Sequence, residues 1–253
     1  MRAVRREEVA DPPYPRAVAK KVLFLYNDPT AAEAMLGDAF VECGYDTHTF
    51  EIVTAEGAAD PRFDVTLPDP RDYDAVVPLG SRWSVNDGAH GMAWITSEVA
   101  MVRDAHEAGV PLLGVCFGGQ LLAHALGGSV ERSPAPEIGW YDVDSARTDL
   151  VPQGPWFEWH FDRFTVPPGA VEVARTGSAP QAFVMGRTMG LQFHPEVDEG
   201  LLELWLAGDG AAEIERLGRT ADQLRDLTRR ELDAATKRVH RLVRSFVETV
   251  AQS

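Results

Sequence analysis

The stretch that decides the fold runs from Pro111 to Gly128 and reads PLLGVCFGGQLLAHALGG. An apolar run ends in Gly-Val-Cys-Phe-Gly, and a helix-like pattern follows it and closes at two glycines. This is the GxCxG form of a nucleophile elbow, a sharp strand-to-helix turn that projects one side chain into a cleft. Cys116 is at its apex, where a helix N-terminus favours the thiolate, and the N–H of Phe117 is expected to face an oxyanion. A buried structural cysteine fits the same pattern, so the elbow alone leaves both interpretations open.

A second motif offers the base that a cysteine nucleophile needs. Residues 189–196 read MGLQFHPE, a strand-like run that ends at His-Pro-Glu. Proline fixes φ and cannot extend strand pairing, so His194 is held at a strand end. Glu196 is close enough in sequence to orient one ring nitrogen while the other faces the thiol. The two motifs together predict a nucleophile, a base and an orienting carboxylate in Cys116, His194 and Glu196.

Around the elbow, apolar runs alternate with helix-like segments, which indicates a parallel sheet covered by helices on both faces. The strands are expected at residues 21–26, 48–53, 75–79 and 112–115, and the helices at 30–43 and 91–108. After Gly128, short strand-like pieces separated by Pro/Gly turns predict an antiparallel extension. Near the C-terminus, apolar residues recur at three- to four-residue intervals among charges, which predicts an amphipathic helical tail; they are Leu217, Leu224, Leu227, Val239, Leu242, Val243, Phe246 and Val250.

The chain therefore divides into a loose leader (1–20), an α/β domain (21–206) and a C-terminal helical extension (207–253). The leader mixes charges with prolines and has no apolar run suited to a signal peptide or a membrane span. Two cysteines, Cys43 and Cys116, in a chain without such a signal predict a cytoplasmic, reducing compartment. Cys43 has no elbow around it and is assigned to structure.

Composition restricts the partners and cofactors. The chain has 253 residues and a formal net charge of −15, which repels nucleic acid and anionic membranes alike. The sequence has no cluster with metal-ligand spacing, no GxxxxGK[ST] loop and no convincing GxGxxG, so neither a metal nor a nucleotide cofactor is predicted. Oligomeric state has no sequence signal here.

GVCFGGQ followed by QFHPE resembles the class I, or triad, glutamine amidotransferases. The overall sequence pattern is similar to that of stand-alone proteins related to the amidotransferase domain of GMP synthase. The resemblance runs from about Lys21 to about Trp205 and includes three further segments, PLGS at 78–81, EIGW at 137–140 and WHFD at 159–162. It implies a three-layer α/β sandwich with a mainly parallel, flavodoxin-like central sheet. It also implies that Cys116 attacks the side-chain amide of glutamine, that a γ-glutamyl thioester forms, and that ammonia passes to a separate acceptor or synthase.

The resemblance also assigns roles outside the triad. Gly80 would offer the oxyanion a second N–H beside Phe117, and Gln120, His160 and Phe161 would contact the substrate. The residues themselves also fit an ordinary turn glycine at position 80 and a polar helix start at position 120. Phe161 replaces the usual glycine of this segment, and Arg82 and Trp83 are bulkier than the residues that many relatives carry near the Gly80 turn.

Two other functions fit the same motifs. A γ-glutamyl peptide or conjugate hydrolase would use the same three residues on a different substrate. A catalytically silent binding module would keep the fold alone, because fold by itself does not establish function. For the helical tail, packing on its own domain and binding of a partner are both compatible with an apolar stripe.

Overall fold

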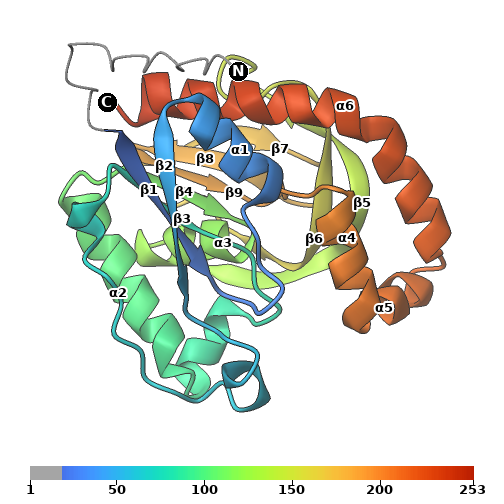
Figure 1. The fold of residues 1–253 in the computed structure, drawn as a ribbon, viewed down its shortest axis with the longest axis horizontal. Coiled ribbons are helices and arrows are strands. Elements are labelled where there is room, and N and C mark those ends of the chain that lie inside the picture. Colours follow the sequence, from blue (N-terminus) through green and yellow to red (C-terminus); the bar gives the residue numbers. More distant parts are fainter. Residues whose placement is uncertain (1–18) are drawn as a thin grey trace, which may run out of the picture.

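A computed structural model describes residues 19–253, so most of the predicted leader lies outside the described residues. Nine strands form one sheet in the order β2-β1-β3-β4-β9-β8-β7-β5-β6 (Figure 1). The strands are β1 (Lys20–Tyr26), β2 (Tyr45–Glu51), β3 (Ala75–Pro78), β4 (Leu112–Val115), β5 (Val130–Ser145), β6 (Gly154–Phe164), β7 (Val171–Arg175), β8 (Pro180–Met185) and β9 (Thr188–Leu191).

The sheet has a parallel half and an antiparallel half. Strands β2, β1, β3, β4 and β9 pair in parallel, whereas β9, β8, β7, β5 and β6 pair antiparallel. The predicted α/β fold with an antiparallel extension is therefore confirmed. The extension is wider than the sequence indicated, because β5 and β6 form a long hairpin in place of the short pieces expected there.

Helices cover both faces of the sheet. They are α1 (Ala34–Glu42), α2 (Ala93–Glu107), α3 (Phe117–Ala125), α4 (Glu199–Trp205), α5 (Ala211–Arg216) and α6 (Ala221–Ser245). The residues of α1 and α6 share one buried apolar cluster with the sheet, and those of α2 and α3 share another with its opposite face. The molecule thus has the three layers that the resemblance implied (Figure 1).

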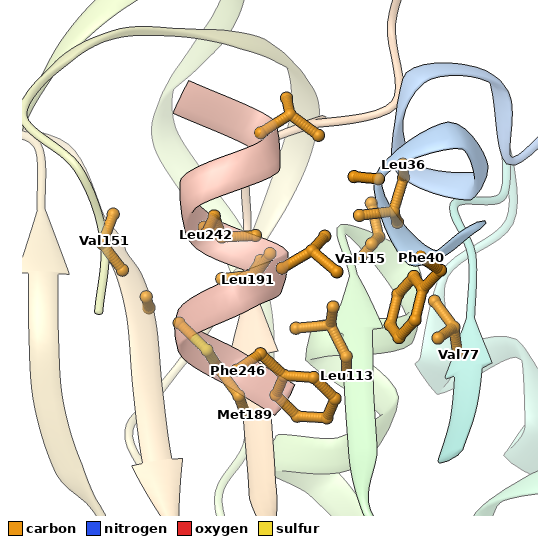
Figure 2. Close-up of a cluster of buried hydrophobic side chains, with 14 of the residues drawn as sticks. Leu36, Phe40, Val77, Leu113, Val115, Val151, Met189, Leu191, Leu242 and Phe246 are labelled. Carbon is orange, nitrogen blue, oxygen red and sulfur yellow. The ribbon is translucent and has the colours of Figure 1, made fainter. Parts of the chain in front are cut away.

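The C-terminal helix α6 packs on its own sheet. Figure 2 shows Leu242 and Phe246 in one apolar cluster with Leu36 and Phe40 of α1 and the strand residue Val115. Leu242 and Phe246 are fully buried, so the apolar stripe of the tail belongs to the core. Leu217, expected in the same stripe, is 41% exposed because it lies after the end of α5 and outside α6.

The described helices include none with the length and apolar character needed to cross a membrane.

The parallel half of the sheet determines where a site can form. Strands β3, β4 and β9 are adjacent and run in the same direction, so the loops that follow them gather at one edge. In open α/β sheets, ligands bind outside the carboxyl ends of such strands. Gly80, Cys116 and His194 all follow these three strands.

Candidate active site

The elbow holds Cys116 in a backbone conformation that few non-glycine residues adopt. Its φ is 50° and its ψ is −106°, and the residue is both the last before α3 and the first after β4. Such strain persists only where the surroundings over-determine it, and it is found preferentially at functional sites. The Cys116 N–H donates to the carbonyl oxygen of Leu191 at 2.9 Å, so the end of β9 fixes the turn.

The thiol lies next to a histidine that has one ring nitrogen engaged and the other unpartnered. His194 Nδ1 is 2.6 Å from Oε1 of Glu196, and both side chains are buried. His194 Nε2 is buried and has no hydrogen-bond partner among residues 19–253. Gln192 Nε2 donates toward the Cys116 sulfur at 3.7 Å. The arrangement leaves one imidazole nitrogen free for proton transfer at the thiol.

Electrostatics favour a proton on this imidazole. Burial lowers the pKa of His194, but the nearby Glu196 carboxylate and Cys116 sulfur outweigh burial and hold that pKa well above its usual value. Trp205 closes one side of the ring, with its centroid 4.9 Å from that of His194. A protonated His194 between a carboxylate and a sulfur matches the charge distribution of an imidazolium–thiolate pair.

The Gly80 turn lies against both reacting side chains. A methyl group at position 80 would stand 3.0 Å from Cε1 of His194 and 3.9 Å from Cβ of Cys116, so glycine permits this close approach. Phe117 is the first residue of α3, and its N–H therefore has no acceptor within the helix. The two backbone segments expected to donate to an oxyanion border the same space.

One pocket of about 440 Å³ is lined by all eight residues that the sequence and the resemblance singled out. Besides those already placed, Gln120 donates through Nε2 to the carbonyl oxygen of Asp162 at 3.0 Å and so ties α3 to the 159–162 segment. Phe161 faces the pocket with the Arg132 guanidinium 4.8 Å from its ring centroid. A cavity of this size lies in the range, roughly 300–1,000 Å³, that holds drug-sized ligands.

His160 is buried under the pocket in a polar cluster. Its Nδ1 is 3.1 Å from the carbonyl oxygen of Asp162, which only accepts, so Nδ1 carries a proton. Its Nε2 is 3.1 Å from Glu137 and 3.4 Å from Glu158, and burial followed by the Glu137 charge raises the pKa of Glu158 well above its usual value. In the described residues this is the group that comes nearest to a metal-ligand set. Glu137 already accepts hydrogen bonds from Thr176 and Gln181. The group is therefore explained as a buried hydrogen-bonded network.

Sequence reasoning missed several residues in and around the pocket. Gln192 does not line the pocket but donates toward the Cys116 sulfur from beneath it. It lies two positions before His194 in the same strand-like run, and the two-residue period of a strand could have placed it on the same side. The wall formed by Leu204–Glu213 had no local signal, because only the packing of α4 and α5 brings it to the site. Arg82 is anchored on the pocket rim by Asp28, with Nε 2.7 Å and Nη2 3.0 Å from the carboxylate.

The short His194–Glu196 contact supports a prediction. We expect Glu196→Gln to lower the turnover of an active enzyme by about 10²-fold, because a neutral amide no longer stabilises the protonated imidazole. The pKa of His194 should fall in the variant, since the carboxylate is the largest influence raising it. The rate of glutamate release and its pH profile give the measurement. Glu199→Gln is the matched control, because Glu199 is exposed at the start of α4; equal activity of both variants would contradict the role of Glu196.

The fold and the pocket define an α/β protein that carries a cysteine at a strand–helix elbow beside a histidine–carboxylate pair. Residues 72–204 match the profile of the class-I glutamine amidotransferase family. The chain belongs to this family. The match covers more than half of the chain and includes both the elbow and the His-Pro-Glu segment.

Individual relatives agree with the family assignment. The chain is 34% identical over 165 residues to a GMP synthase [glutamine-hydrolyzing] of Aeropyrum pernix. The matched region covers 60% of this chain and 32% of that protein. It is 32% identical over 139 residues to the corresponding protein of Thermomicrobium roseum, covering 52% of this chain and 26% of that one. This chain thus spans about a third or less of the length of these curated relatives.

Solved structures resemble this chain over more than nine tenths of its length. A glutamine amidotransferase from Thermotoga maritima superposes with a TM-score of 0.78 at 26% identity, covering 94% of this chain and 100% of that one. A glutamine amido transferase from Methylobacillus flagellatus gives a TM-score of 0.77 at 24% identity, covering 91% and 95% respectively, and supports the fold. The similarity to both structures extends beyond the family match into the C-terminal helices.

Proposed function

We propose that this protein hydrolyses the side-chain amide of glutamine with Cys116, His194 and Glu196 as a catalytic triad. The observation that carries the proposal is the convergence of three elements on one pocket: a strained cysteine at an elbow, an imidazole with one nitrogen unpartnered, and a carboxylate 2.6 Å from its other nitrogen. Membership of the class-I glutamine amidotransferase family supports the same substrate.

The reaction follows from this arrangement. The Cys116 sulfur attacks the amide carbon, and the N–H groups of Phe117 and Gly80 stabilise the negative charge on the oxygen. Protonated His194 gives its proton to the departing nitrogen, so ammonia leaves and a γ-glutamyl thioester remains. His194 then takes a proton from water, the hydroxide attacks the thioester carbon, and glutamate leaves as the Cys116 sulfur regains its charge. Glu196 holds the imidazole in the required orientation throughout.

The ammonia is proposed to serve an acceptor bound by a separate polypeptide. The sequence has no phosphate loop that would activate such an acceptor, and the chain covers about a third of GMP synthase relatives that are described as glutamine-hydrolyzing. A separate synthase subunit would provide the missing function. Glutamine would then be the small-molecule substrate of this chain.

A second candidate is hydrolysis of γ-glutamyl conjugates. A pocket of about 440 Å³ has room for a leaving group larger than ammonia. The part of the wall contributed by residues 205–213 lies beyond the end of the family match, so it is a feature by which this chain could select a different amine. The acyl chemistry at Cys116 would be unchanged.

The deciding experiment measures glutamate release from glutamine and from γ-glutamyl amides of increasing leaving-group size. We expect glutamine to be hydrolysed and bulky amides to be rejected. Faster release from the larger amides would favour the conjugate hydrolase. If the purified protein releases glutamate from none of them, alone or with added synthase subunits, the proposal is wrong and the protein is a binding module on this fold.

A further inference from the structure

Helix α2 contains a buried carboxyl group that the proposed reaction does not use. Glu98 is fully buried, and its neighbours at helical spacing, Trp94 and Val102, are buried apolar residues. Within the described part of the chain, its sole hydrogen bond runs from Asn27 Nδ2 to Oε1 at 3.1 Å, and its Oε2 has no partner. An unpaired carboxylate in such surroundings is costly, so a glutamate kept here requires an explanation.

Asn27 connects this carboxyl group to the Gly80 turn. Its Nδ2 also donates to the carbonyl oxygen of Leu79 at 3.2 Å, so both hydrogens of the amide are used. Its main-chain carbonyl oxygen accepts from the hydroxyl of Ser81 at 2.7 Å. Asn27 therefore holds the residues on both sides of Gly80, and it is itself fully buried.

The two unpartnered oxygens on this pair belong together. Asn27 Oδ1 and Glu98 Oε2 are both buried, and neither has a donor among the residues that the structure describes. A single proton on Oε2 would supply that donor: Oε2–H would donate to Oδ1 while Nδ2–H donates to Oε1, which would give a closed acid–amide pair. A neutral carboxylic acid would then satisfy both atoms, whereas a carboxylate satisfies neither.

We propose that Glu98 and Asn27 form a buried acid–amide pair that positions the Gly80 turn, and with it one of the two N–H donors of the oxyanion site. The inference rests on the proposed function, because Gly80 matters to the reaction through that donor. Neither residue lines the pocket; both are positioning residues that act through the backbone of 79–81. Gly80 in turn lies against His194 and Cys116, so the position of the turn sets where its N–H meets the developing oxyanion.

The ionisation of Glu98 agrees with this arrangement. Burial raises its pKa to about 8, and the Asn27 hydrogen bond offsets a smaller part. No charged group contributes to that shift; Asn27, which directly follows β1, is neutral, and the next residue, Asp28, is paired with Arg82. The acid is therefore neutral below about pH 8. Above that pH it loses the proton that joins the pair, and the turn loses its support.

The test compares Glu98→Gln, Glu98→Ala and Asn27→Ala with the wild type, and uses Glu107→Gln as the control because Glu107 is an exposed acid on the same helix. Glutamine at position 98 keeps both hydrogen bonds at any pH. We expect Glu98→Gln to retain kcat below pH 8 and to exceed the wild type above it. Glu98→Ala and Asn27→Ala should lose about 10- to 100-fold in kcat with little change in KM, because one oxyanion donor is misplaced.

Two further measurements distinguish a failure of this inference from the misfolding of a variant and from a failure of the proposed function. Alkylation of Cys116 needs no oxyanion donor, so its rate should remain at the wild-type level in both alanine variants if they are folded. The Tm of Glu98→Gln should exceed that of the wild type by a margin that grows as pH rises from about 5 to 8, because the folded-state pKa of the acid is raised. If the wild type is active and Glu98→Gln has the same pH profile and the same Tm, the inference is wrong. A wild type inactive on glutamine would instead overturn the proposed function.

Discussion

Cys116→Ala is expected to lose glutamate release by at least about 10⁴-fold at saturating glutamine. The sulfur is the atom that forms the covalent intermediate, and removal of a nucleophile from a triad leaves only the contribution of binding and of the oxyanion donors. The pocket should persist in the variant because Cys116 contributes its backbone to the elbow and little volume to the core. Glutamine binding, measured by calorimetry, should therefore be kept while turnover disappears.

Cys43→Ala is the matched control for this prediction. Cys43 is the second of the two cysteines in the chain, lies at the end of α1 and is only partly buried. We expect its substitution to leave turnover within about twofold of the wild type, as is usual for a site away from the chemistry. Equal residual activity in both variants would show that the sulfur of Cys116 is not the nucleophile.

The sequence predicted the parts of this protein whose physical cause is local. The elbow is a strand, a turn and a helix in direct succession, so apolar spacing and glycine positions are enough to recognise it. The His-Pro-Glu segment is equally compact. The fold class followed from the alternation of buried strands and helices, and the structure and the family match confirm it.

The long hairpin of β5 and β6 was not predicted because prolines interrupt its first strand. Pro134 and Pro136 lie in β5 at the point where the pairing register shifts. In β6, residues 157–162 read FEWHFD and alternate apolar with polar side chains, yet the polar Glu158 and His160 are buried as well as Phe157. The polar positions of this strand therefore do not mark a solvent-exposed face.

Contacts between distant elements account for the remaining parts of the site that the sequence did not predict. Glu98 lies four residues from both Trp94 and Val102, a spacing that puts a carboxyl group inside a buried helical stripe, and this signal was present. Its partner Asn27 lies 71 positions away, and no pattern in the sequence joins them. The wall from α4 to α5 likewise reaches the pocket only through tertiary packing.

Gly118→Ala is expected to destabilise the fold by at least about 3 kcal/mol, a loss of roughly 6–12 °C in Tm for a chain of this size. A methyl group at position 118 would stand 1.9 Å from the carbonyl oxygen of Pro78, and the atom it meets belongs to the backbone of β3 and cannot rotate away. Helix α3 would have to move away from the sheet. The elbow that presents Cys116 leads directly into that helix, so it would be displaced too. Urea unfolding and thermal melting measure the effect.

Gly177→Ala is the control, because no atom of a residue beyond its chain neighbours in the described structure lies within 4 Å of the added methyl there, and its φ is not positive. We expect that control to unfold at the wild-type midpoint, and a Gly118→Ala protein that did the same would show that α3 does not depend on this close approach to β3.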